Sequence, residues 1–218
     1  MRVARKESRT TDHRTRVGHE RSARTELRIL DAALGVFAEM GPDAPTIDHF
    51  VEAAAISRGT FYNYFESVDE LLAATSEWVT SELIDPIEPA LADIEGEALR
   101  FGVALRLLFV RAQTNPFFCR FVARVWSVTG IELPMRDLQQ GLRTGVFRAP
   151  SPESARDLVS GAVREAMLRI RRVLGAADYG TEIVALCLQA LGIDSRRVTA
   201  ILKHPLPRIP APERSTTQ

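Results

Sequence analysis

Apolar residues recur three and four positions apart along most of this chain, the spacing that places side chains on one face of an α-helix. The first clear example begins at Ser22, which can cap a helix, and ends at Gly41 and Pro42, which stop one. Its apolar face consists of Leu27, Leu30, Leu34 and Phe37. No segment shows the strict alternation of a β-strand or the signature of a hairpin turn. The pattern therefore predicts an all-α fold of about nine helices.

Two short helices joined by a tight turn are predicted between Thr46 and Phe65. Thr46 follows Pro45 and can cap the first helix, whose apolar positions are Ile47, Phe50, Val51 and Ala54. Ser57 can cap the second helix, in which Phe61 and Phe65 face inward. The side chains left to point outward are Arg58, Thr60, Tyr62, Asn63 and Tyr64. An apolar anchor that presents such groups suits the major groove of DNA, so we interpret the pair as a helix-turn-helix.

A larger helical region follows this pair. Ser67 and Glu70 form a capping box that begins a long helix, which Pro86 and Pro89 bend or end. Further helices are predicted over residues 94–113, from 116 to the break at Thr129-Gly130, and over 134–144, 151–174, 181–191 and 195–202.

The two ends of the chain differ from its helical part. Residues 1–21 are polar and charged without periodicity, so we expect an Arg-rich arm that is disordered in the free protein. It is either a solubilising tail or start-site extension, or an arm that follows phosphates or enters a minor groove. Residues 203–218 are rich in proline and are expected to form a disordered tail. Between them lie a small head, residues 22–66, and a larger helical domain, residues 67–202.

The charges of the chain balance overall but not locally. The 218 residues include 28 basic and 28 acidic side chains, and 45% of them are hydrophobic, enough for a substantial core. Residues 1–30 carry nine basic side chains against four acidic ones, whereas residues 31–66 carry only Arg58 against six acidic ones. A basic arm beside a nearly neutral head is compatible with DNA binding.

Several function classes lack support in the sequence. The two cysteines, Cys119 and Cys187, have no metal-ligand spacing, and the four histidines are scattered. We find no glycine-rich phosphate loop, nucleophile elbow or carboxylate cluster with a partner histidine, so we expect no enzyme, cofactor or metal site. No apolar run approaches the ~18 residues of a membrane span, and no secretory signal is present. A soluble cytoplasmic protein is therefore expected.

The stretch from Thr46 to Phe65, followed by Ser67 and Leu71, resembles the tetracycline-repressor (TetR) family of bacterial transcriptional regulators over about residues 22–75. The later order of helices is also similar, including Gln140-Gly141 and Gly145-Val146-Phe147 ahead of a long helix. The resemblance implies a homodimer joined by its last two long helices and two heads in successive major grooves of a near-palindromic operator. It also implies an effector pocket in residues 67–202, whose ligand releases the DNA.

The resemblance assigns candidate DNA contacts to the head. The matching positions are Thr46 for a phosphate contact and Arg58, Gly59, Thr60, Tyr62, Asn63 and Tyr64 in the recognition helix. Ser57 and Arg24 are further candidate DNA contacts. By its chemistry, Arg58 can bond guanine O6 and N7. Asn63 can read adenine or contact only the backbone, and Tyr62 and Tyr64 suit phosphates. We therefore expect Arg58→Ala to act at one operator position and Tyr64→Phe to weaken all sequences alike.

Two positions depart from the family pattern. The turn position usually held by glycine is Ala55, and alanine in a left-handed conformation costs ~1 kcal/mol. The lysine common after Ser67 is Val68, so one phosphate contact is missing. We expect the Arg-rich arm to offset that loss.

The larger domain contains candidate residues for an effector pocket. Candidate pocket walls are Trp78, Phe109, Phe118, Phe121, Trp126 and Met167, although at helical spacing such residues also form ordinary core. Arg106, Arg124 and Arg164 can select an anionic ligand or lie on solvated faces. Two alternatives remain open: a ligand-independent repressor or architectural DNA binder, and an activator or nucleoid-type binder.

Overall fold

The structure of the protein, a computed structural model, describes the backbone of residues 4–129, 135–170 and 176–209 and the side chains of residues 20–125, 135–170 and 179–209. Over these ranges it contains α-helices, one π-helix and no strand, which confirms the all-α prediction. The helices are α1 (Ala4–Met40), α2 (Ile47–Ala53), α3 (Arg58–Tyr62), α4 (Val68–Val79), η1 (Thr80–Ile84), α5 (Ile87–Ala90), α6 (Glu97–Thr114), α7 (Pro116–Thr129), α8 (Arg136–Thr144), α9 (Pro152–Arg169), α10 (Ala176–Ala190) and α11 (Ser195–Lys203).

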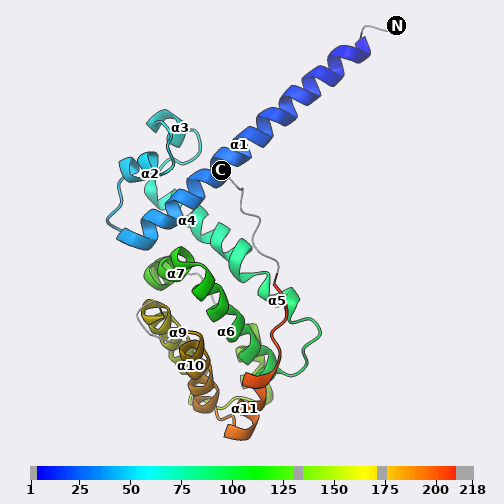
Figure 1. The fold of residues 1–218 in the computed structure, drawn as a ribbon, viewed down its shortest axis with the longest axis vertical. Helices are drawn as coiled ribbons and strands as arrows, with labels where there is room; N and C mark the ends of the chain where they lie inside the picture. The colour runs from blue at the N-terminus through cyan, green and yellow to red at the C-terminus, as the bar shows by residue number, and fades with distance from the viewer. Residues whose placement is uncertain (1–3, 130–134, 171–175, 210–218) are drawn as a thin grey trace.

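The helices form two groups joined by α4. Figure 1 shows α2 and α3 beside α1 at one end of the molecule and helices α6 to α11 at the other. Helix α4 contacts α1 in the first group and α7 in the second, and α1 itself packs against α7. The head therefore rests directly on the larger domain through two helices.

Helix α1 is longer than the sequence pattern predicts. It begins at Ala4 rather than at Ser22, so the segment that we expected to be disordered is helical from Ala4 onward. Its amino-terminal part projects away from the rest of the molecule in Figure 1. This segment has no proline and is rich in arginine, which favours helices. Extending a helix that is already nucleated adds one hydrogen bond per residue without a new nucleation cost.

Phenylalanines form the core of the head. Phe37 of α1, Phe50 of α2 and Phe61 of α3 are fully buried, and the rings of Phe37 and Phe50 lie 4.9 Å apart. Phe65 is also buried, as its spacing predicts. Leu27, by contrast, is 37% exposed, although we expected it on the buried face of α1.

The helical segment that connects the head to the larger domain begins as the α-helix α4 and continues as the π-helix η1. Ser67 caps α4 by accepting from the N–H of Glu70 at 3.1 Å, as predicted, but the Glu70 carboxylate accepts from Glu66 rather than from Ser67. Near Pro86 the chain forms the π-helix η1, closed by a 2.8 Å bond from the N–H of Asp85 to the carbonyl of Thr80. Proline has no N–H and cannot continue an α-helix, which explains why the regular helical hydrogen bonding ends near Pro86, as predicted.

Helix α6 lies at the centre of the larger domain. It contacts α7, α8, α10 and α11, and most of its side chains are buried. A Cβ added at Gly102 of α6 would lie 2.4 Å from Ile201 of α11, so the glycine lets α11 approach closely. Within the described ranges, no helix is long and apolar enough to cross a membrane.

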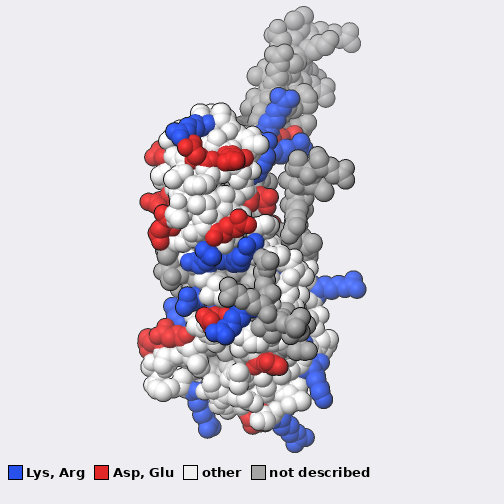
Figure 2. All heavy atoms as spheres, turned by 60° about the vertical axis from the view of Figure 1, so that its left-hand side comes forward, with Lys and Arg blue, Asp and Glu red and all other residues white. Residues whose placement is uncertain are grey.

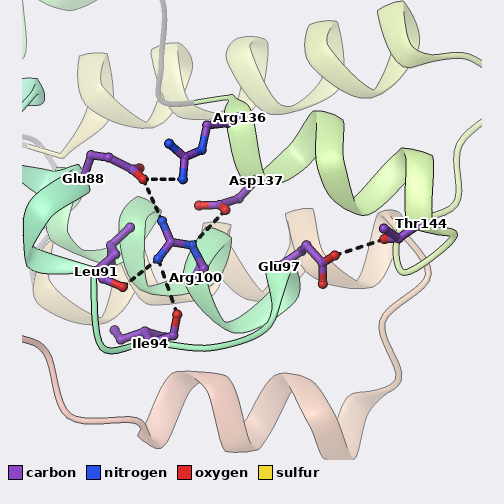
Figure 3. A network of polar contacts seen from close by, with 8 residues as sticks. All are labelled: Glu88, Leu91, Ile94, Glu97, Arg100, Arg136, Asp137 and Thr144. Carbon is purple, nitrogen blue, oxygen red and sulfur yellow. Dashed lines mark hydrogen bonds and ion pairs between the residues drawn. The ribbon is translucent and has the colours of Figure 1, made fainter.

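Arg100 of α6 ties three elements of the larger domain together (Figure 3). It donates to Asp137 of α8 at 2.9 Å, to Glu88 of α5 at 2.7 Å and to the carbonyl of Leu91 at 2.6 Å. Burial disfavours the charged form, but the hydrogen bonds and charges of Asp137 and Glu88 outweigh it, so the pKa of Arg100 is raised. This network fixes the segment after η1 against α6 and α8.

Part of the segment that we expected to be a disordered tail is packed. Beyond α11, Leu206 and Ile209 are half-buried against the core, while residues 210–218 lie outside the described residues. Arg106 of α6 donates to the carbonyls of Ile201 at 3.0 Å and His204 at 2.7 Å. Arg106 is half-buried, and its two hydrogen bonds hold the chain as it leaves α11, so it does not lie on a solvated face. Arg124 and Arg164 are exposed and do lie on solvated faces.

Candidate DNA-binding surface

Helix α2 begins with a cap that uses histidine. Thr46 is the N-cap residue, as predicted, and its N–H donates to Nδ1 of His49 at 2.9 Å. The Thr46 hydroxyl lies 3.0 Å from the same nitrogen. Capping boxes normally place Glu or Gln at this third position, so the sequence pattern did not reveal the role of His49.

The turn between α2 and α3 is a Schellman motif with alanine at its left-handed position. Ala55 has φ of 49°, and it is the only non-glycine residue with positive φ in the described part of the chain. The N–H of Ile56 donates to the carbonyl of Val51 at 3.0 Å, and the N–H of Ala55 to Glu52 at 3.1 Å. This confirms the strained alanine that the sequence predicts.

Replacing Ala55 with glycine should stabilise the protein by about 0.5–1 kcal/mol. Glycine removes the cost of ~1–2 kcal/mol for a Cβ in the left-handed region, but part of that gain is lost because glycine gives the unfolded chain more conformational entropy. Chemical denaturation at fixed protein concentration measures the difference. Ala53→Gly, two residues earlier in the last helical position of α2, is the control and should destabilise by about 0.5–1 kcal/mol. A loss of stability in Ala55→Gly would contradict this account of the turn.

Helix α3 is short, and it exposes most but not all of the side chains that the sequence predicts to point outward. Ser57 caps it by accepting from the N–H of Thr60 at 3.0 Å, and its hydroxyl lies 2.9 Å from that of Thr60. The helix ends at Tyr62, so Asn63 is the C-cap residue and Tyr64 lies in the following turn. The exposed residues are Ser57, Arg58, Gly59, Tyr62 and Asn63, and Thr60 is half-buried.

Tyr64 points back towards α1 and is half-buried. Its hydroxyl lies 3.2 Å from the hydroxyl of Ser22, which places the ring between α1 and the end of α3. A hydroxyl that already has a partner within the head is less free to reach a phosphate than the sequence suggests. Tyr62, which is 54% exposed, is the freer of the two tyrosines.

Gly59 occupies a helical position that does not require glycine. Its φ is not positive, and an added Cβ would meet only the hydroxyl of Ser57, at 3.8 Å, an ordinary contact distance. Glycine inside a helix costs about 0.5–1 kcal/mol relative to alanine. The conformation and packing of the chain therefore do not require glycine at this position.

Arg58 is held by an acidic residue of α2. Its Nε donates to Asp48 at 2.8 Å, and one Nη donates to the other oxygen of the same carboxylate. The hydrogen bond and charge of Asp48 raise the pKa of Arg58. The sequence pattern did not connect these residues, because they lie on different helices and only the fold brings them together.

Charge on the candidate surface is mixed. Arg24 is exposed on α1, with Arg21 and Arg28 three and four residues away on the same helical side. Asp48, Glu52 and Glu66 are exposed nearby in the chain. Figure 2 shows acidic and basic side chains interspersed on the visible face rather than one large basic patch.

Five of the six residues suggested as pocket walls belong to the core or pack against it. Phe109, Phe118, Phe121 and Met167 are almost fully buried, Trp78 is half-buried, and the side chain of Trp126 lies outside the described residues. The ring of Phe121 in α7 lies 6.2 Å from that of Phe37 in α1. Such burial is compatible with a closed apolar pocket and with ordinary core packing. The contact between Phe121 and Phe37 places one candidate pocket residue against the head.

The cysteines and the carboxylates do not assemble into a chemical site within the described residues. Cys119 is buried and its thiol donates to the carbonyl of Met167 at 2.9 Å. Burial raises the pKa of the Cys187 thiol to about 11, which disfavours a reactive thiolate. No group of three or more potential metal ligands was found there.

Sequence comparisons match the head. A model of the bacterial regulatory proteins of the tetR family matches residues 29–75. The chain is 38% identical over 64 residues to an uncharacterized HTH-type transcriptional regulator of Bacillus subtilis, YvdT, covering 29% of this chain and 33% of the relative. It is 35% identical over 78 residues to the HTH-type transcriptional regulator CymR of Pseudomonas putida, covering 36% and 38%. These matches thus span well under two thirds of the relatives' lengths.

Structural comparisons extend over most of the chain. RolR without ligand has a TM-score of 0.64 and 26% identity, covering 85% of this chain and 100% of RolR. RolR in complex with resorcinol has a TM-score of 0.57 and 25% identity, covering 88% and 100%. SmeT, the repressor of a Stenotrophomonas maltophilia multidrug efflux pump, has a TM-score of 0.62 and 21% identity, covering 84% and 97%, and shares the fold.

Proposed function

Because the chain belongs to the TetR family of bacterial regulatory proteins, we propose that it is a sequence-specific DNA-binding regulator of transcription. The match to the family model over residues 29–75, which contain α2 and α3, carries this proposal. The head is residues 22–66 and the effector-binding and dimerisation domain is residues 67–202. Selection of bound sequences from a random DNA pool tests the proposal.

The outer face of α3 reads the operator. Arg58 and Asn63 contact base edges, while Thr46, Ser57, Thr60 and Tyr62 contact the phosphate backbone. Tyr64, whose hydroxyl lies 3.2 Å from that of Ser22, packs the end of α3 against α1 instead. The missing Cβ of Gly59 lets the DNA approach the start of α3. The exposure of most of these side chains supports the assignment.

The basic end of α1 contributes affinity rather than specificity. Arg21, Arg24 and Arg28 are exposed on α1, and further arginines precede them in the sequence. A helical arm of this kind contacts phosphates beside the head and offsets the absent lysine at Val68. Phosphate contacts of this type make DNA binding depend on salt.

Removing residues 1–21 should lower DNA affinity and flatten its salt dependence. The slope of log K against log salt should fall by about 0.9 for each phosphate contact that is lost. Arg24→Ala should have the effect of one contact, and Arg143→Ala, which removes an exposed arginine of α8, is the matched control. Titrations of DNA binding at several salt concentrations measure these slopes. A slope that the truncation leaves unchanged would exclude the arm from the DNA interface.

Two such chains form a homodimer through α9 and α10. Leu158 and Leu168 of α9 and Leu186 of α10 are 45%, 38% and 60% exposed in the single chain. Large apolar side chains on the last two long helices support an interface there. A two-fold dimer presents two heads, and its operator is then near-palindromic.

A small molecule bound in the larger domain releases the repressor from its operator. The complex of RolR with resorcinol supports this step, since RolR resembles the chain over most of its length. The contact between Phe121 and Phe37 offers a route from the larger domain to the head. Loss of DNA binding is measured against a panel of apolar and anionic small molecules that includes resorcinol. Release by none of them favours the ligand-independent repressor or architectural binder.

A further inference from the structure

Asp48 and Arg58 meet on the outer face of the helix pair although they lie on different helices. Nε and one Nη of Arg58 donate to the two carboxylate oxygens of Asp48, at 2.8 and 2.5 Å. Asp48 is in the first turn of α2 and Arg58 begins α3, so the ion pair crosses the turn between them. Two parallel bonds hold the planar guanidinium in one orientation as well as one position.

This ion pair leaves the other edge of the guanidinium open. Asp48 uses the edge formed by Nε and one Nη, and no other group in the described part of the chain accepts from Arg58. The two Nη atoms together form the second edge, whose parallel N–H groups match guanine O6 and N7. Asp48 and a guanine therefore bind different edges and can be bonded at the same time.

The stability of the fold does not account for the pair. The side chains of Arg58 and Asp48 are 64% and 62% exposed, and ion pairs so exposed contribute little to folding. A carboxylate beside DNA also repels phosphates and lowers affinity for every sequence. An acidic group at this place is explained if it increases the difference in binding affinity between the correct DNA sequence and incorrect ones.

We infer that Asp48 is a positioning residue that sets base specificity through Arg58. It holds the guanidinium with its two-Nη edge available to guanine, so less side-chain freedom is lost on binding the correct base. Where no guanine is present, Arg58 forms no bidentate base contact, and the repulsion between Asp48 and the phosphates remains. This inference rests on the proposed function, because it requires Arg58 to read a base.

The test compares full-length variants on the operator half-site selected by the wild-type protein and on that half-site with each other base at the guanine position. Asp48→Ala should lower the preference for guanine about fivefold or more, which is part of the discrimination of one bidentate contact. Its affinity for unrelated DNA should rise. Glu52→Ala is the matched control, since it removes another exposed carboxylate of α2 that has no bond to Arg58. It should raise the affinity for unrelated DNA and leave the base preference unchanged.

A double variant separates positioning from charge. In the Arg58→Ala background, Asp48→Ala should no longer change the base preference. An equal change on all sequences, as in Glu52→Ala, would overturn the inference while leaving Arg58 as a base reader. Tighter binding with an unchanged or larger preference would also overturn it, because Asp48 would then compete with guanine. If Arg58→Ala loses no preference, the assignment of Arg58 fails as well, and only a wild-type protein that selects no sequence contradicts the proposed function. Circular dichroism confirms that each variant is folded.

Discussion

Replacing Arg58 with alanine should abolish most of the preference for one base in each operator half-site. A bidentate contact to guanine is worth about 5- to 150-fold in discrimination, and no other exposed cation begins α3. Affinity for operators already substituted at that position should change much less. Binding titrations against the selected site and its single-base variants measure the loss.

The control for this prediction removes an arginine elsewhere. Arg143→Ala in α8 deletes an exposed positive charge of the larger domain and should leave the base preference intact. A uniform loss in Arg58→Ala across all operator variants would instead mean that Arg58 contacts only phosphates.

Replacing Phe37 with alanine should destabilise the protein by about 3–5 kcal/mol. Phe37 is fully buried, and its ring lies 4.9 Å from Phe50 of α2 and 6.2 Å from Phe121 of α7. Its loss leaves a cavity between the head and the larger domain. The two parts should then unfold less cooperatively. Tryptophan fluorescence, which reports the larger domain through Trp78 and Trp126, and far-UV circular dichroism should give transitions that no longer coincide.

Phe117→Ala provides the matched control on α7. Phe117 is 44% exposed and packs beside Arg120, whose guanidinium lies 5.2 Å from the ring. Its replacement should cost much less than that of Phe37, about 1 kcal/mol or less, with coincident transitions. Equal losses in the two variants would contradict the role of Phe37 as the packing link between head and body. Protein concentration must be held constant, since dimerisation shifts apparent stability.

Local signals in the sequence predicted most of the helices. The caps at Ser57 and Ser67 and the break at Gly41 depend on neighbouring residues only, and the structure has each of them. The spacing of apolar residues likewise predicted the buried face of the head, because one face of a short helix must cover its neighbours.

Features that depend on the fold were not predicted. The amino-terminal part of α1 has no apolar period, so only its helix propensity indicated a helix. The Asp48–Arg58 pair joins two helices ten positions apart in sequence, and no periodic pattern marks it. Leu206 and Ile209 pack although prolines surround them, because Arg106 anchors the preceding turn. Local patterns therefore located the candidate surface, and tertiary contacts determined how its side chains are oriented.

The most direct test of the account is selection of bound sequences from a pool of random double-stranded DNA by the full-length protein at stated salt. We predict one enriched, near-palindromic site with half-sites about one helical turn (~34 Å) or a multiple apart, because two heads of a dimer bind successive major grooves. A strongly preferred guanine in each half-site should disappear with Arg58→Ala. A pool without any enriched sequence would contradict the account.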